Sequence, residues 1–439
     1  MLPRALWLSC LLAVARAQSE ETTATPSETI TAQDGVPTSL DVTYASISTT
    51  ITLLPTAGSL SPTTASNGNG TALSTASGSQ TTEDVTLIVG GQTTLSSNGT
   101  MTSSGATSRT STSAAPVNTQ PCNGHVEFCE RKYSNITYVA AHNSPFSRPG
   151  NAASNQLLPV TSQLNDGIRM LQSQSHFVNN TLYLCHTSCD ILNAGTLEDY
   201  LRTVTLWVED HPFDILTILL GNSDLVSVDN YIAPIQNSGL WPYLYTPPTI
   251  PLSLPNWPTL SSMILRQKRV VLFMDYMANQ TAVPYILDEF LHIWETPFSP
   301  TDPTFPCTVE RPPELPEEQA RESLMYMANH NLNTGLTFLG NEILVPNVAR
   351  INQTNAVEGP GSLGAMAEDC TDLWGRPPNF LLVDFYDAGS GSVFEVAAEL
   401  NGVAYDLECC GLIEPAAQAP RRPGVLLAAM VAGVAALLC

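Results

Sequence analysis

Short apolar runs that end in polar or turn residues recur through the middle of this chain. They cover residues 138–141, 168–172, 181–185, 214–220, 270–274 and 380–385. A short apolar run followed by turn residues is typical of a β-strand that is buried on both faces. These six runs therefore predict strands, and each strand ends where polar side chains begin.

Segments with helical periodicity alternate with several of these runs. The clearest is 196–211, where the apolar positions are Leu197, Tyr200, Leu201, Val204, Trp207 and Val208. Thr196 is placed to cap this helix, and Glu198 and Asp199 lie in its first turn, where the helix dipole favours acids. Further helices are expected at 284–294, 317–331 and 391–400.

Strands that alternate with helices indicate an α/β fold with a parallel sheet. The part of the chain with mixed periodicity, residues 121–411, is close in length to the roughly 250 residues of a (β/α)8 barrel. We therefore expect a (β/α)8 TIM-type barrel or a distorted version of it. Strands buried on both faces also fit a doubly wound sheet, which stays open as an alternative.

The composition changes sharply before residue 121. Residues 18–120 are rich in Ser, Thr, Gly and Ala and contain hardly any Lys or Arg. Such a segment cannot bury enough apolar surface to offset its ordering entropy. We expect a disordered, O-glycosylated stalk in front of the barrel.

Both ends of the chain carry targeting patterns. Residues 1–17 have a basic residue, a short apolar run and an Ala-Arg-Ala cleavage pattern, which indicate a signal peptide. Residues 412–439 combine small residues, a Pro-rich spacer and a terminal apolar run, which is the pattern of a glycosylphosphatidylinositol (GPI) anchor signal. A single-pass membrane helix is the alternative, but the run of 16 residues at 424–439 is short for one. We expect a secreted protein on the extracellular face of the plasma membrane or in the cell wall.

Charge and cysteine content narrow the function further. A net charge of −23 argues against a nucleic-acid partner, which needs basic patches. The cysteines outside the two terminal signals number eight, and an even number outside the cell predicts disulfides. We expect local pairs at Cys122–Cys129 and Cys185–Cys189. Six glycosylation sequons, at Asn69, Asn98, Asn135, Asn179, Asn279 and Asn352, fit secretion.

Polar side chains follow nearly every predicted strand. They are His142, Asn143, Gln172, Gln174, His186, Asn222, Asp275 and Asp384. A histidine or carboxylate at one strand end alone indicates no more than a hydrogen-bonded or capping residue. In a (β/α)8 barrel, however, the carboxyl ends of the strands meet around one site, so together these residues predict a lined pocket.

The motifs that carry these residues resemble the phosphatidylinositol-specific phospholipase C X-domain superfamily. The chain is most similar within it to the secreted fungal phospholipase C-like phosphodiesterases. The resembling stretches are Ala141-His-Asn-Ser, Gly167-Ile-Arg-Met-Leu-Gln-Ser-Gln, Leu184-Cys-His-Thr, Asn193-Ala-Gly-Thr-Leu-Glu-Asp-Tyr200 and Leu382-Val-Asp-Phe385. The resemblance spans about residues 121–410 and so covers the whole predicted barrel.

The resemblance implies a role for three of the residues. His142 matches the general base that activates a neighbouring hydroxyl of the substrate, and His186 matches the general acid that protonates the leaving alkoxide. Asp384 matches the carboxylate that orients the base. The implied substrate-binding residues are Asn143, Gln172, Gln174, Asn222 and Asp275. The implied reaction is attack of that hydroxyl on phosphorus to give a cyclic phosphodiester.

The chain departs from the superfamily on the second strand. Bacterial members carry Asp and Arg there, and calcium-dependent animal members carry acidic metal ligands, whereas this chain has Gln172 and Gln174. Neutral amides provide no charge for a developing dianion and are poorer calcium ligands than carboxylates. Asp275 stands where bacterial enzymes use a basic residue to hold inositol. We expect no metal or other cofactor; calcium through Asn143 stays open but has no carboxylate cluster to support it.

Three hypotheses follow from the sequence. The first is an extracellular phosphodiesterase, a monomer, that acts on a phospholipid or a phosphoinositol-containing glycolipid through His142 and His186. The second is a catalytically weak barrel that binds lipid or glycan at the cell surface, which the two glutamines favour. The third is a structural wall mannoprotein whose function is the glycosylated stalk.

Overall fold

The computed structural model describes residues 51–52, 119–338 and 341–411. The predicted signal peptide, nearly all of the predicted stalk and the predicted anchor signal lie outside the described residues. Among the described residues, no helix has the length and apolar character that crossing a bilayer requires.

Eight parallel strands form the barrel, and they follow one another around it in the order of the sequence. They are β2 (Tyr138–Ala141), β3 (Met170–Val178), β6 (Leu216–Asn222), β8 (Val270–Met274), β9 (Leu287–Asp288), β10 (Ile293–Glu295), β11 (Met325–Asn329) and β14 (Phe380–Val383). β14 pairs with β2, so the last strand is joined to the first. Among the described residues, β9 and β10 are not paired by strand hydrogen bonds. The expected (β/α)8 barrel is confirmed, in a distorted form that is open between β9 and β10.

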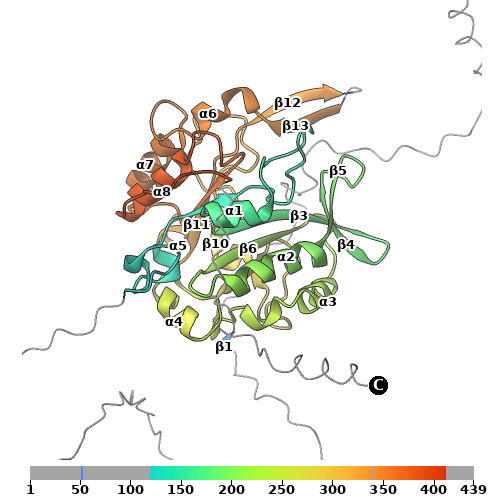
Figure 1. The fold of residues 1–439 in the computed structure, drawn as a ribbon, viewed down its shortest axis with the longest axis vertical. Coiled ribbons are helices and arrows are strands. Elements are labelled where there is room, and N and C mark those ends of the chain that lie inside the picture. The colour runs from blue at the N-terminus through green and yellow to red at the C-terminus, as the bar shows by residue number, and fades with distance from the viewer. Residues whose placement is uncertain (1–50, 53–118, 339–340, 412–439) are drawn as a thin grey trace, which may run out of the picture. The chain divides into compact units, whose positions relative to one another are not determined.

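Helices pack outside the curled sheet (Figure 1). They are α1 (Val160–Asp166), α2 (Leu197–Asp210), α3 (Asp229–Asn237), α4 (Leu260–Leu265), α5 (Glu317–Glu322), α6 (Ile351–Thr354), α7 (Leu363–Trp374) and α8 (Ser392–Asn401). The hydroxyl of Thr196 accepts a hydrogen bond from the amide of Asp199, as its predicted capping role requires. The predicted helices at 196–211 and 391–400 are therefore confirmed as α2 and α8.

The side chains inside the barrel change from apolar to polar along the strands. The lower layers belong to one apolar cluster, which includes Tyr138, Ala140, Met170, Leu219, Phe273, Met327, Phe380 and Leu382. Alternate strand residues point to the same face, so the next inward positions are the polar residues at the strand ends. A second, larger apolar cluster lies between the sheet and the helices. The apolar layers thus support a polar layer at the carboxyl end of the barrel.

The predicted third strand is not a strand of the barrel, which corrects the sequence interpretation of its place. β4 (Thr181–His186) folds back antiparallel on β3, and β5 (Leu192–Thr196) pairs antiparallel with β4. The two turn residues Asn179 and Asn180 both have positive φ, 50° and 61°. Two such residues make the tight turn that suits a twisted hairpin, and asparagine tolerates this backbone conformation.

Two of the predicted helices are wrong in whole or in part. Residues 284–294 form β9, the 3-10 turn η5 (Glu289–Leu291) and the start of β10. The predicted helix at 317–331 ends at Glu322, and the chain continues as β11. Short apolar runs do not reveal by periodicity alone whether they are helix or strand. Here the buried side chains Leu287 and Ile293 complete the barrel interior, which decides for strands.

Other connections add two small antiparallel pairs to the barrel. One joins β12 (Asn333–Phe338) to β13 (Asn341–Pro346), and the other joins β1 (Ile51–Thr52) to β7 (Thr249–Ile250). The disulfides Cys122–Cys129 and Cys185–Cys189 are present as predicted. Cys307 pairs with Cys370 and Cys409 pairs with Cys410, so all eight cysteines of the described residues are bonded.

Candidate active site

His142 and Asp384 meet at the carboxyl end of two paired strands. Ala141 of β2 lies opposite Val383 of β14 in the register, so the residues that follow them are neighbours. The Nδ1 atom of His142 lies 2.8 Å from Oδ1 of Asp384, and both side chains are buried. We assign the imidazole proton to Nδ1, which then donates to the carboxylate. This leaves the lone pair of Nε2 available to accept a proton.

Two asparagines that the sequence did not single out complete the surroundings of this imidazole. The amide nitrogens of Asn155 and Asn331 lie 3.2 and 3.3 Å from Nδ1 of His142. The Asn155 amide also donates to Oδ1 of Asp384 at 2.9 Å. Asn155 thus fixes the carboxylate, and the carboxylate fixes the ring.

Asn143 covers the other side of the imidazole. Its side-chain amide lies 3.1 Å from Nε2 of His142 and donates to it. Its backbone N–H donates to Oε1 of Gln172 at 2.7 Å, and its φ is 49°. Gln172 therefore holds the turn that positions Asn143, and Asn143 has to release Nε2 before a substrate hydroxyl can take its place.

Several buried polar atoms next to His142 have no hydrogen-bond partner among the described residues. They are Oδ1 of Asn143, Asn155 and Asn331, and Oδ2 of Asp384. An unsatisfied buried polar atom costs about 1–3 kcal/mol. All four are acceptor oxygens, so their concentration around one imidazole is the expected feature of a site built to receive hydrogen-bond donors such as substrate hydroxyls.

Gln172 and Gln174 line a narrow cavity in the polar layer of the barrel. The cavity is also lined by Leu219, Gly221, Asp275, Glu289, Glu295, Phe298, Arg311, Met327, Asn329 and Leu382. Oε1 of Gln174 accepts a hydrogen bond from the hydroxyl of Ser223 at 2.9 Å. A Cβ atom on Gly221 would lie only 2.2 Å from this oxygen. Glycine at 221 thus makes room for the glutamine.

The one cation in the lining of this cavity, Arg311, is paired with a carboxylate. Nη1 of Arg311 lies 3.1 and 3.3 Å from the two carboxylate oxygens of Glu295. Burial raises the pKa of Glu289 well above its usual range, which favours the protonated acid. The sequence analysis did not identify two residues of the cavity, Glu289 and Arg311. Glu289 follows β9 in a segment that was predicted as helix, and Arg311 lies in the long connection after β10.

Asp275 and Asn222 contact each other rather than the imidazole. The backbone N–H of Asn222 donates to Oδ1 of Asp275 at 2.8 Å, and the side chain of Asn222 donates to the carbonyls of Val226 and Tyr276. Burial raises the pKa of Asp275 to about 6. Asp275 lines the cavity, whereas the groups of Asn222 are used to hold the loops that follow β6 and β8.

His186 ends β4 and lies against the loop that follows β2. Its ring stacks on Phe146 with the centroids 5.2 Å apart, and it is buried. The adjacent Cys185 is bonded to Cys189, which fixes the turn after the histidine. The described hydrogen bonds of His142 run to residues other than His186. The structure therefore brings together His142, Asp384, Asn143 and Gln172, and His186 packs on Phe146, whose backbone N–H donates to the carbonyl of Asn143 at 2.9 Å.

The described residues contain no group of three or more His, Cys, Asp or Glu side chains arranged to hold a metal ion. Arg169, which precedes β3, binds Asp214 at 2.8 Å. It therefore belongs to the outside of the barrel and not to the polar layer, in agreement with its odd offset from Gln172 and Gln174.

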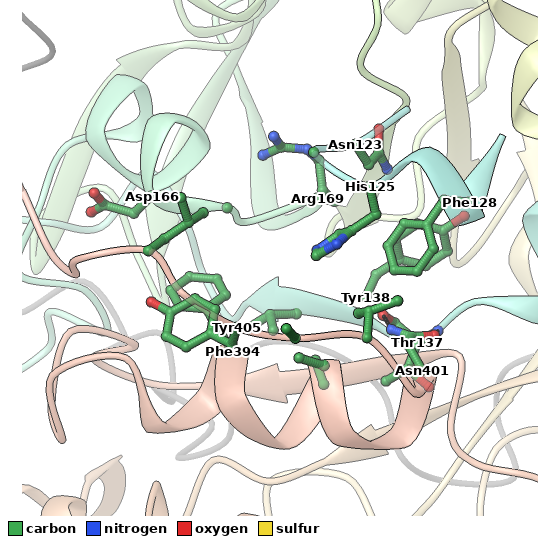
Figure 2. A pocket seen from close by; sticks show the side chains of 18 of the residues that line it. Asn123, His125, Phe128, Thr137, Tyr138, Asp166, Arg169, Phe394, Asn401 and Tyr405 are labelled. Carbon is green, nitrogen blue, oxygen red and sulfur yellow. Dashed lines mark hydrogen bonds between the residues drawn. The ribbon is translucent and has the colours of Figure 1, made fainter. Parts of the chain in front are cut away.

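A second cavity lies at the opposite end of β2 (Figure 2). Figure 2 shows the imidazole of His125 pointing into it, with Phe394 and Tyr405 on the side of α8. Two of its polar residues bind each other: Asn401 holds both the N–H and the carbonyl of Thr137, at 3.0 and 2.8 Å. This cavity is therefore built differently from the one at the carboxyl end.

Comparison with known proteins gives a consistent result. The family model described as PI-PLC X matches residues 128–401. An "Uncharacterized secreted protein" of Arthroderma benhamiae is 60% identical over 336 residues, which are 76% of this chain and 74% of that protein. A "PI-PLC X domain-containing protein 1" of the same fungus is 38% identical over 286 residues, which are 64% of this chain and 90% of that protein.

Among solved structures, the chain is similar to the phosphatidylinositol-specific phospholipase C of Listeria monocytogenes, with a TM-score of 0.42 and 15% identity. That match covers 63% of this chain and 96% of the bacterial chain. A glycerophosphodiester phosphodiesterase of Agrobacterium tumefaciens gives a TM-score of 0.27 and 10% identity over 58% of this chain and 99% of that one.

Proposed function

Because this chain belongs to the PI-PLC X domain family, we propose that it is an extracellular phosphodiesterase that cleaves a phospholipid or a phosphoinositol-containing glycolipid. The observation that carries this proposal is the buried contact of 2.8 Å between Nδ1 of His142 and the carboxylate of Asp384, which leaves the lone pair on Nε2 when the proton is assigned to Nδ1. This is the arrangement that a general base requires, because the carboxylate both orients the ring and stabilises its protonated form.

The proposed reaction needs the two histidines in different protonation states. Nε2 of His142 removes the proton from a substrate hydroxyl next to the phosphodiester, and that oxygen bonds to phosphorus. The bond from phosphorus to the lipid oxygen breaks, and His186 in its protonated form gives its proton to that leaving oxygen. The products are a cyclic phosphodiester and the lipid alcohol, and the two histidines have exchanged one proton.

The uncharged glutamines of the cavity set a limit on this chemistry. The side-chain amides of Gln172 and Gln174 can donate hydrogen bonds to the non-bridging oxygens of the phosphoryl group, but they bring no charge. The charge of Arg311 is engaged by Glu295. We therefore propose slow, metal-independent turnover, with the substrate held by hydrogen bonds from amides.

A second candidate function is a lipid- or glycan-binding module with little turnover. The same pairing of Arg311 with Glu295 favours it, because it leaves the phosphoryl site without an uncompensated cation. Both candidates place the substrate at the carboxyl end of the barrel, and they differ only in whether a bond is cleaved.

Secretion is part of the proposal. It is supported by the terminal targeting patterns, by the four disulfides and by the name of the relative that is 60% identical. The sequon asparagines Asn135, Asn179, Asn279 and Asn352 are all exposed and therefore accessible to glycosylation. A GPI anchor would hold the barrel at the membrane or wall surface where such lipids occur.

A headgroup-release assay on the full-length secreted protein tests the proposal. Vesicles of phosphatidylinositol and of a phosphoinositol glycolipid are incubated with the protein, once with calcium and once with chelator. We expect release of a cyclic phosphate under both conditions, reduced about 10²- to 10⁴-fold in the His142→Ala and His186→Ala variants. His211→Ala, at the outer end of α2, is the matched control. Release that survives both substitutions contradicts the mechanism, and binding without release favours the second candidate.

A further inference from the structure

We propose that His176, oriented by Asp224, is a third imidazole of the site that binds a hydroxyl of the substrate headgroup at the mouth of the barrel. Its Nδ1 atom lies 2.9 Å from Oδ1 of Asp224. This inference rests on the proposed function, because it assigns an outer part of the same substrate-binding site. His176 is a contact and specificity residue in this proposal, and it takes no part in the bond cleavage.

The position of His176 on β3 points its side chain to the barrel side. Met170 packs in the apolar interior of the barrel, and Gln172 and Gln174 line the cavity above it. Alternate residues of a strand share a face, so His176 continues this row. Leu171 and Phe177, on the other face, pack in the cluster between the sheet and the helices. β3 runs past the barrel into the hairpin with β4 (Figure 1), so the row ends at the mouth.

Ser223 and Asp224, which follow β6, contact two successive residues on the barrel side of β3, Gln174 and His176. The hydroxyl of Ser223 donates to Gln174 at 2.9 Å, and Asp224 binds His176. The second oxygen of Asp224 accepts the backbone N–H of Phe177 at 2.6 Å. The carboxylate is thereby fixed on the strand itself, and it can orient the imidazole in one way only.

The free end of this imidazole is suited to accept a hydrogen bond. If Nδ1 donates to Asp224, the lone pair of Nε2 remains. Nε2 is buried and has no hydrogen-bond partner among the described residues, although 15% of the side chain is exposed. The arrangement repeats that of His142 with Asp384, in which Nδ1 lies 2.8 Å from a carboxylate oxygen, against 2.9 Å here.

The height of His176 above the reaction centre indicates the kind of substrate. His142 follows Ala141, which lies opposite Leu171, so His142 is level with Gln172. Four residues of strand separate this level from His176, which is about 13 Å at a rise of roughly 3.3 Å per residue. This distance exceeds the reach of a single inositol ring at the phosphodiester. We infer that the bound hydroxyl belongs to a sugar attached to the inositol, so that the preferred substrate is a glycosylated phosphoinositol lipid.

Direct binding and turnover together test this inference. Calorimetry with soluble inositol 1-phosphate and with a hexosyl-inositol 1-phosphate compares the full-length protein with its His176→Ala variant. We expect the substitution to lower the affinity for the hexosyl compound about tenfold, which is about 1.4 kcal/mol, and to leave the affinity for inositol 1-phosphate unchanged. In turnover of the glycolipid, KM should rise about tenfold with kcat unchanged, because the contact is equal in ground and transition state.

Matched variants separate this role from a structural one. His176→Gln keeps an acceptor and should recover part of the affinity, whereas Asp224→Asn keeps the bond to Phe177 and should lose part of it. His211→Ala, whose ring stacks on Trp207 outside the barrel, should change neither ligand. Equal weakening of both ligands, weakening of neither, or no binding by the wild-type protein overturns the inference. The proposed function fails separately, if glycolipid is bound but no headgroup is released or His142→Ala releases it at the wild-type rate.

Discussion

At the end of the barrel where the strands finish, Asn143, Asn155 and Asn331 surround one imidazole with carboxamide oxygens that have no partner among the described residues. At the end where the strands begin, Asn401 binds both polar groups of the Thr137 backbone and has neither side-chain atom to spare. The same side chain is used in opposite ways at the two ends. The two ends therefore differ in whether these buried amides have partners, and this difference is what the proposed active site requires.

The charged residues repeat this difference. At the beginning of the strands, Arg169 binds Asp214, and Asp166 accepts hydrogen bonds from Tyr386 and Gly411. The exceptions there are the hydroxyl of Tyr405, Nε of Arg269 and Nε2 of His292, which are buried and have no partner among the described residues. Of these three, Tyr405 lines the cavity of Figure 2, whereas Asn401, Asp166 and Arg169 are paired, so we interpret this cavity as a packing crevice. The narrower cavity, in which Arg311 is paired with Glu295, adjoins the His142–Asp384 pair through Gln172 and Asn143.

The largest effect that separates the two ends should come from the carboxylate partner of His142. Asp384→Asn keeps the size of the side chain but removes the charge that stabilises the protonated imidazole. We expect headgroup release to fall about 10²- to 10⁴-fold. Asp166→Asn, at the other end, should leave release within about twofold of wild type. Comparable losses in the two variants would erase the functional difference between the ends.

The next largest effect should be on stability, at the end where the strands begin. Asn401→Ala removes two hydrogen bonds to Thr137 and leaves a buried backbone N–H and carbonyl unsatisfied. We expect the free energy of unfolding to fall by about 2–3 kcal/mol, with kcat unchanged once the protein is folded. Urea denaturation and headgroup release measure the two quantities. A loss of kcat without a loss of stability would show that the crevice takes part in the reaction.

How much of each end of the barrel can be predicted from the sequence depends on whether its residues belong to a local pattern. His142 and Asp384 come directly after apolar runs, and the parallel pairing of β2 and β14 places them side by side. The barrel itself was predictable because short apolar runs such as 270–274 alternate with segments of helical periodicity, which is the pattern of a parallel α/β sheet. These features depend on short segments whose neighbours in the fold follow from the order of the strands.

The remaining residues depend on contacts across the fold that no local pattern records. Asn155 reaches His142 from a loop without helical or strand periodicity, and Asn331 follows a strand that was predicted as helix. Arg311 lies in the cavity because of the long connection after β10. The Asn179–Asn180 turn did carry a local signal, since paired asparagines favour a tight hairpin. That signal would have shown that β4 is a hairpin strand and that β3 extends to His176.

A smaller effect that also separates the two ends should appear in the pH dependence of stability. Burial raises the pKa of Asp275 to about 6, whereas an unfolded aspartate titrates near 3.8. Below about pH 4 the group is protonated in both states and costs nothing. As the pH rises from about 4 to about 6, the unfolded chain loses its proton first, so this group lowers stability, and the loss is complete above pH 6.

Asp275→Asn should therefore stabilise the protein at pH 7 by about 1–3 kcal/mol and have no effect at pH 4. Asparagine keeps the oxygen that accepts the N–H groups of Asn222 and Tyr276, so the loop geometry is retained. Urea midpoints measured from pH 4 to pH 7 for both proteins check this. A variant that is less stable than wild type at pH 7 would mean that the carboxylate is compensated by the cation of Arg311.

The smallest effect should come from His125, the imidazole that lines the cavity at the beginning of the strands. His125 points into that space, and its ring lies 4.7 Å from the ring of Phe128. Burial lowers its pKa, so the ring is neutral at neutral pH and brings no charge to a ligand. We expect His125→Ala to change stability by less than about 1 kcal/mol, the value of one aromatic contact, and to leave headgroup release and its KM unchanged.

Thermal denaturation and the vesicle assay, run beside His176→Ala, compare an imidazole at each end of the same barrel. If removal of His125 raises KM as much as removal of His176 does, the beginning of the strands also contacts substrate, and unsatisfied polarity is not what distinguishes the two ends.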